Sequence, residues 1–290
     1  MLFSTNTTIA VDREGIGLER GIEMLLDAGF PALDLSFFKY RYFVMEDGYK
    51  ETAKRIRSLA ESRGAFFNQA HAPSGGYKAY VEEMVPDMPR IIEFAGLIGV
   101  KNIVVHPLIA HRHYGNEREH FEMNMEFYSS LAPYAKNAGV KIAIENMWTT
   151  HPVTGVIVDS VCADPTELAN YYDSLGDPEA FTVCLDLGHV ALCGREPEDA
   201  IRVIGGDRLG AIHAHDVDYR SDLHTLPGQS RLNWDAICRS LAEVGYKGEF
   251  TLESDNFPVR YGVEHLPTAF RFMADTARYY ANLVDSYRAK

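Results

Sequence analysis

The chain has 290 residues, of which 46% are hydrophobic and 24% charged, and it carries a formal net charge of −13. These values are typical of a globular protein with a sizeable core and exclude a disordered chain, a coiled coil and a collagen-like repeat. Four cysteines without a Cys-x-x-Cys pair exclude a disulfide scaffold and give no thiolate metal site. The acidic balance weighs against a general nucleic-acid binder, because it repels phosphate backbones.

The N-terminal segment lacks the basic residues and the long apolar run of a signal peptide. No stretch approaches the roughly 18 apolar residues of a membrane-spanning helix. The few cysteines fit a reducing compartment. We therefore expect a cytoplasmic protein that does not enter a membrane.

Short apolar runs recur along the chain at regular intervals. Each is rich in Val, Ile, Leu or Phe and is apolar on both faces, as buried parallel strands are. In chain order, the predicted strands are Phe3–Ala10, Ala32–Phe37, Ala65–Ala72, Asn102–His106, Lys141–Glu145, Thr182–Asp186, Gly210–His213 and Glu249–Glu253.

Segments with helical spacing separate these runs, for example Leu18–Ala28 and the stretch that follows Pro267. Four helices are predicted to end at a glycine followed by an apolar residue, at Gly29, Gly99, Gly139 and Gly245. Eight strands in series with helices predict an α/β fold, a single-domain (β/α)₈ TIM barrel over residues 1–290. An open doubly wound sheet is the alternative, but the chain has no glycine-rich phosphate loop.

Six consecutive predicted strands deliver an acidic residue or a histidine to their C-terminal ends, where the active site of a barrel lies. These residues are His71, His106, Glu145, Asp186, His213 and Glu253. Each one alone could be a hydrogen-bonded structural residue or a salt-bridge partner. Packing all six together without a cation would be costly, so the pattern predicts a metal site.

Glu145, Asp186, His213 and Glu253 form a tighter set, because each directly follows an apolar run. Three carboxylates and one imidazole favour Mn²⁺, Mg²⁺ or Co²⁺, and Zn²⁺ is also compatible. His215 competes with His213 for the role of ligand, since strand alternation points both inward. We favour His213 because its position matches the other three.

Further candidate site residues lie in the segments that follow the predicted strands. His189 comes one turn after Asp186, and Asp222 and His224 lie in the loop after the seventh strand. These residues are predicted to bind substrate oxygens or a second metal ion. Trp148, just after the fifth strand, either walls the pocket or caps the rim of the barrel.

The ordered motifs resemble those of the xylose isomerase-like TIM-barrel superfamily, over nearly the whole chain. They are HAP at His71, VVHP at His106, AIEN at Glu145, LDLGH at Asp186–His189, IHAHD at His213, the D-x-H…PG stretch from Asp222 to Gly228, and GEFTLE at Glu253. This superfamily includes sugar phosphate isomerases and epimerases, ketose 3-epimerases, inosose dehydratases and endonuclease IV.

The resemblance to the isomerase and epimerase branch implies a divalent-metal-dependent enzyme acting on a sugar, keto-sugar or related polyol, without an organic cofactor. Glu145, Asp186, His213 and Glu253 would bind one metal ion. One of the two glutamates would take a proton next to a carbonyl and the other would return it, through an enediolate stabilised by the metal. His189, His71, His106, His215, Asp222, His224 and Trp148 would contact the substrate or a second metal ion. Because barrels of this superfamily often pair, the resemblance implies a homodimer or a homotetramer.

Two other reactions stay open. Endonuclease IV cleaves abasic DNA with a trinuclear zinc site, and residues matching nearly all its ligand types are present. It carries D-T-C-H or D-T-S-H and H-x-N-D stretches, whereas this chain has Asp186-Leu187-Gly188-His189 and His213-Ala214-His215-Asp216. Nucleic acid is therefore not the expected partner. A dehydratase or lyase of a keto-polyol, similar to inosose dehydratase, would use the same proton abstraction.

Overall fold

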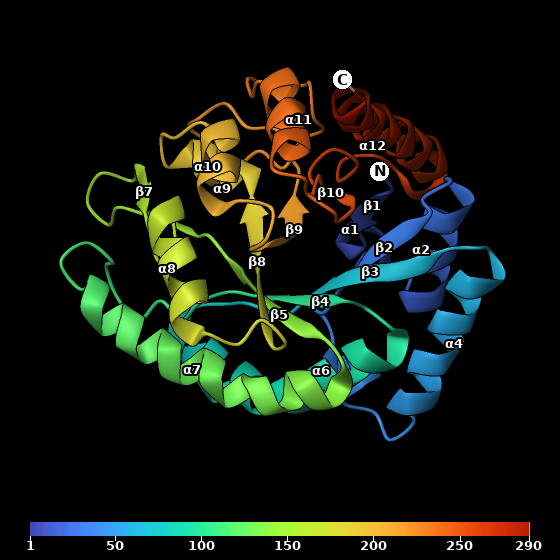
Figure 1. Ribbon diagram of the computed structural model, residues 1–290. Coiled ribbons are helices and arrows are strands. Elements are labelled where there is room, and N and C mark those ends of the chain that lie inside the picture. Colours follow the sequence, from blue (N-terminus) through green and yellow to red (C-terminus); the bar gives the residue numbers. More distant parts are fainter. Residues whose placement is uncertain (290) are drawn as a thin grey trace.

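Eight parallel strands form one sheet in the order β10-β1-β2-β3-β4-β5-β8-β9 in the computed structural model, which describes residues 1–289 (Figure 1). They are β1 (Phe3–Asn6), β2 (Ala32–Ser36), β3 (Phe66–His71), β4 (Asn102–Val105), β5 (Lys141–Glu145), β8 (Phe181–Asp186), β9 (Leu209–His213) and β10 (Phe250–Leu252). The sheet curls until a bridge between Ala214 and Leu252 joins its two edges. The predicted (β/α)₈ barrel is thereby confirmed.

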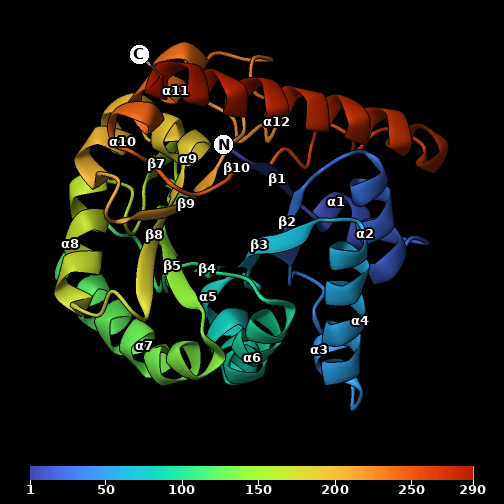
Figure 2. The same ribbon diagram turned by 45° about the vertical axis from the view of Figure 1, so that its right-hand side comes forward.

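Helices surround the barrel, as Figure 2 shows. The main ones are α2 (Leu18–Asp27), α4 (Tyr49–Ser62), α6 (Met88–Ile98), α7 (Glu117–Ala138), α8 (Pro165–Leu175), α10 (Pro197–Ile204), α11 (Trp234–Glu243) and α12 (Leu266–Arg288). Shorter helices are α1 (Thr8–Val11), α3 (Arg41–Val44), α5 (Tyr77–Ala79) and α9 (Leu187–Leu192). Among residues 1–289, no helix has the length and apolar character needed to cross a membrane.

The inside of the barrel explains where the polar residues lie. Four small or medium side chains on neighbouring strands pack together there: Val104, Ala143, Cys184 and Ala211. Side chains alternate along a strand, so the residue two positions further on each strand also points inward. These next residues are His106, Glu145, Asp186 and His213. The four apolar side chains therefore lie one layer below the polar residues at the carboxyl ends of β4, β5, β8 and β9.

The first predicted strand, Phe3–Ala10, is too long. The side chain of Asn6 accepts a hydrogen bond from the backbone N–H of Thr8 (2.8 Å), and the chain turns there into α1. Ile9, Ala10 and Val11 are buried on that helix instead of on a strand. The other strand boundaries agree to within a residue or so. A hairpin of β6 (Trp148–Thr150) and β7 (Ile157–Asp159), which the sequence did not predict, follows β5.

The predicted helix-ending glycines have positive φ angles, from +68° at Gly245 to +96° at Gly29. Gly99 and Gly139 are the left-handed caps of α6 and α7. A side chain at such an angle would be strained, so these positions favour glycine. The glycine stops predicted from the sequence are confirmed.

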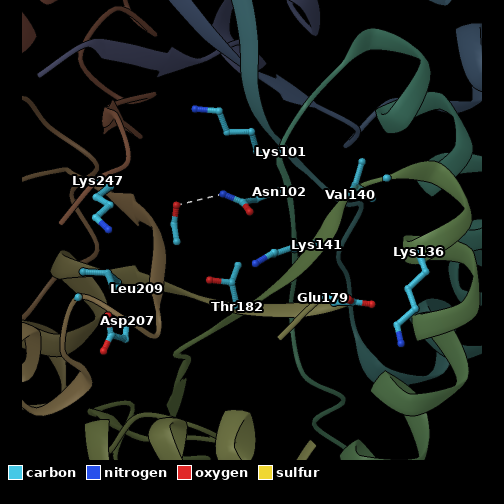
Figure 3. A pocket seen from close by; sticks show the side chains of 13 residues that line it. Lys101, Asn102, Lys136, Val140, Lys141, Glu179, Thr182, Asp207, Leu209 and Lys247 are labelled. Carbon is cyan, nitrogen blue, oxygen red and sulfur yellow. Dashed lines mark hydrogen bonds between the residues drawn. The ribbon is translucent and has the colours of Figure 1, made fainter. Parts of the chain in front are cut away.

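A cavity of about 650 Å³ opens at the amino-terminal ends of the strands, opposite the polar layer. Four lysines line it, namely Lys101, Lys136, Lys141 and Lys247 (Figure 3). Carboxylates offset their charge: Lys101 pairs with Glu249 (3.1 Å), Lys136 pairs with Asp177 (2.5 Å), and Glu179 and Asp207 also line the cavity. Because four acidic groups balance four ammonium groups, we assign this cavity no part in the chemistry.

Candidate metal centre

Glu145, Asp186, His213 and Glu253 converge at the carboxyl ends of β5, β8, β9 and β10. One donor atom from each lies within 4.8 Å of the others. The first three residues are fully buried and Glu253 is 5% exposed. The Nδ1 atom of His213 lies 2.7 Å from Glu145 Oε1 and 3.1 Å from Glu253 Oε2. Both glutamates thus approach the same imidazole nitrogen.

Three buried carboxylates require compensating positive charge. Burial raises the pKa of Glu145, but His213 and His106 outweigh this effect and hold that pKa well below its usual value. Burial lowers the pKa of His213, and the surrounding acidic groups, including Glu253 and Glu145, reverse this and raise it. The histidines contact these carboxylates in the structure. A divalent cation would supply the compensating charge directly, and the mainly oxygen donor set fits one.

A second group adjoins the first at Glu145 and contains His71 and His106. His106 Nε2 lies 2.8 Å from Glu145 Oε2, and His71 Nε2 lies 3.5 Å from the same oxygen. Burial lowers the pKa of His71, but Glu145 outweighs burial and raises it to about 9. The carboxylate of Glu145 is therefore approached by three imidazoles, from the ends of β3, β4 and β9.

A third group contains His189, His215, Asp222 and His224, whose ligand atoms also lie within 4.8 Å of one another. His224 Nε2 is 3.1 Å from Asp222 Oδ1, and His215 Nε2 is 3.0 Å from Asp186 Oδ1. The third group therefore joins the first at Asp186. Trp148, at the start of β6, is half-buried, and its ring centroid lies 6.3 Å from that of His189. The structure thus brings all the residues selected from the sequence into one array.

Asn146 and Gln69 also hold the array, and neither is among the site residues predicted from the sequence. Asn146 accepts a hydrogen bond from the backbone N–H of Asp186 (2.8 Å) and donates one to its carbonyl (3.0 Å). Gln69 Nε2 lies 3.0 Å from His213 Nε2, the ring nitrogen that faces away from the glutamates. Groups behind a ligand in this way set its orientation. Asn146 directly follows Glu145 in the AIEN motif, which is a signal that could have identified it.

Asp216 organises the loop that carries Asp222 and His224, and it is not among the site residues predicted from the sequence. Its buried carboxylate accepts six hydrogen bonds at 2.9–3.0 Å. The donors are the backbone N–H groups of Val217, Gly228, Ser230, Arg231 and Leu232 and the indole N–H of Trp234. One side chain therefore fixes the far end of this loop against α11.

We expect Asp216→Asn to destabilise the protein by at least about 3 kcal/mol, because the amide NH₂ would face N–H donors and leave them unpaired. For a chain of this size that is a fall in Tm of roughly 6 °C or more. The matched control is Asp218→Asn in the same loop, whose half-buried carboxylate accepts hydrogen bonds from the backbone N–H groups of Arg220 and Ser221. Equal thermal stability of the two variants would contradict this role of Asp216.

The fold and the polar array define a barrel with a buried carboxylate and imidazole centre at the carboxyl ends of its strands. The profile of the family described as "Xylose isomerase-like TIM barrel" matches residues 22–275. The chain belongs to this family.

Two curated relatives are similar in sequence. The uncharacterized protein MJ1311 of Methanocaldococcus jannaschii is 27% identical over 224 residues, which is 73% of each chain. Fructoselysine 3-epimerase of Escherichia coli O157:H7 is 26% identical over 132 residues, covering 44% of this chain and 43% of the relative.

Three solved structures share the fold. A D-tagatose 3-epimerase-like protein has a TM-score of 0.73 at 20% identity, with 99% of both chains covered. D-psicose 3-epimerase has a TM-score of 0.73 at 16% identity, covering 97% of this chain and 99% of the other. The IOLI protein, solved with a binding zinc atom, has a TM-score of 0.70 at 17% identity, with 99% of both chains covered. At these identities the similarity concerns the fold.

Proposed function

We propose that the protein is a divalent-metal-dependent isomerase or epimerase of a sugar, keto-sugar or related polyol. The observation that carries the proposal is the approach of Glu145 and Glu253 to one buried imidazole nitrogen, at 2.7 and 3.1 Å. Moving a proton next to a carbonyl needs a base, an acid and an electrophile around one small centre. The names of the relatives, among them several 3-epimerases of ketoses, support the class of substrate.

In this proposal Glu145, Asp186, His213 and Glu253 hold the cation, which when bound would polarise substrate oxygens and stabilise the charge of an enediolate. One glutamate takes the proton from the carbon next to the carbonyl. The other returns a proton, to the opposite face in an epimerisation. His189 binds a substrate oxygen, and Trp148 limits the access of water.

The test combines metal content with proton exchange. We expect one equivalent of Mn, Co, Mg or Zn per chain in protein purified without added metal. The loaded protein should then interconvert one member of a panel of ketoses, with and without phosphate, and incorporate deuterium from D₂O at the reacting carbon. Absence of bound metal, even after reconstitution, would contradict the proposal.

A zinc-dependent phosphodiesterase that acts on abasic DNA is the second candidate. The observation in its favour is that two further ligand groups adjoin the first, at Glu145 and at Asp186. The net charge of −13 is unfavourable for binding a duplex. Two to three equivalents of zinc, together with cleavage of an oligonucleotide that contains an abasic site, would favour this candidate over the isomerase.

A further inference from the structure

His215 is buried, and it contacts the carboxylate of Asp186 and the imidazole of His224. Gly188 lies against its ring. Its Nε2 atom is 3.0 Å from Asp186 Oδ1 and 3.1 Å from Asp186 Oδ2. The ring stacks on that of His224, with centroids 4.0 Å apart and planes 11° apart. Any Cβ at position 188 would lie only 2.1 Å from His215 Cε1. Only a glycine at that position leaves room for the imidazole.

We propose that His215 is a positioning residue that orients Asp186 for cation binding, and that Gly188 is required because it makes room for His215. The inference rests on the proposed function, since Asp186 is one of the four residues that would hold the cation. It adds a role for two residues that the proposed chemistry does not itself use.

The contacts of Asp186 show how this positioning works. Its Oδ1 atom also accepts a hydrogen bond from the backbone N–H of His189 (2.6 Å), in the first turn of α9. A backbone amide and the Nε2–H of His215 therefore hold the carboxylate from one side. Its Oδ2 atom lies 3.9 Å from His213 Nδ1, on the side of the first ligand group. Loss of the imidazole donor would free the carboxylate to rotate away from that group.

The LDLGH and IHAHD motifs form a single unit in this arrangement. Gly188 lies in the first turn of α9, directly after β8, and His215 lies in the segment after β9, so the two fit together only in the folded barrel. The stack on His224 holds the ring from its other side, which leaves the imidazole little freedom to move. Groups that orient a ligand in this way typically change metal affinity by about 10- to 100-fold.

The experiment measures Mn²⁺ and Zn²⁺ affinity and stoichiometry by competition with a chromogenic chelator. His215→Phe keeps the ring between Gly188 and His224 but removes the N–H donor, and we expect binding about 10- to 100-fold weaker. His215→Gln keeps an N–H donor near the position of Nε2 and should restore part of the affinity. Circular dichroism and Tm check that each variant is folded.

A double-mutant cycle tests the steric part. Gly188→Ala should weaken cation binding in the wild-type background, because it displaces the imidazole. The same substitution should change cation affinity little in a His215→Ala background, where no ring occupies the space. The matched control is Gly48→Ala at the start of α4, where φ is −88° and a Cβ would meet nothing within 4 Å. If Gly188→Ala does not fold, the inference is tested by the cation affinities of His215→Phe and His215→Gln.

The outcomes separate this inference from the proposed function. Two outcomes would overturn the inference and leave the proposed function standing. One is wild-type cation affinity in His215→Phe. The other is an equal loss of cation affinity on Gly188→Ala in both backgrounds. Fewer bound ions with unchanged affinity for the first would also overturn it, because His215 would then be a ligand of a second cation. If the wild type binds no cation, the proposed function fails and the inference fails with it.

Discussion

Glu145→Gln should reduce turnover by at least about 1,000-fold while the protein still folds. General acid–base catalysis by one positioned group contributes about 10²- to 10⁴-fold. The neutral amide cannot take up a proton, and it also removes one of three negative charges from the group that would hold the cation. His213 and His106 both lie within 2.8 Å of the Glu145 carboxylate, so it is central to the array. The measurement is kcat on the substrate found in the ketose panel.

Two controls accompany this variant. Glu51→Gln changes an exposed glutamate of α4 and should leave both turnover and Tm unchanged. Glu145→Asp keeps the charge but withdraws it by one methylene, so it should retain cation binding better than Glu145→Gln. Turnover close to that of the wild type in Glu145→Gln would show that the glutamate of β5 is not part of the acid–base pair.

Removal of the metal should abolish activity and lower the thermal stability. The chelator-treated protein should recover on addition of Mn²⁺, Co²⁺ or Mg²⁺, because the buried carboxylates of Glu145, Asp186 and Glu253 would again be paired with a cation. A cation present at about 100 times its Kd adds about 2.7 kcal/mol to the free energy of unfolding. We therefore expect Tm to fall by several degrees on its removal.

The control is protein treated with chelator that has been saturated with metal before it is added. Activity and Tm are followed in the same samples, so a loss of activity through unfolding is recognised directly. Full activity of the metal-free protein would exclude the proposed mechanism, whatever the metal content of the protein as purified.

Local patterns were sufficient for the barrel and for the positions of the strand-end residues. Ala143 and Glu145 lie two positions apart on β5, and Cys184 and Asp186 do so on β8, and this alternation is a property of any extended strand. The same local logic failed for Phe3–Ala10, because Ile9, Ala10 and Val11 can be buried on a strand or on a helix. The hydrogen bond from Thr8 to the Asn6 side chain decides between them, and the apolar pattern does not show it.

The sequence by itself determined the type of fold, the end of the barrel where the polar residues gather and the residue types that meet there. Only the tertiary structure decided which atoms approach one another. The carboxylate of Asp216 accepts hydrogen bonds from backbone N–H groups further along the loop that it begins. The ring of His215 fits over Gly188 because β8 and β9 are paired neighbours in the sheet. Such contacts form between segments that are far apart in the sequence, and the apolar periodicity of the chain does not predict them.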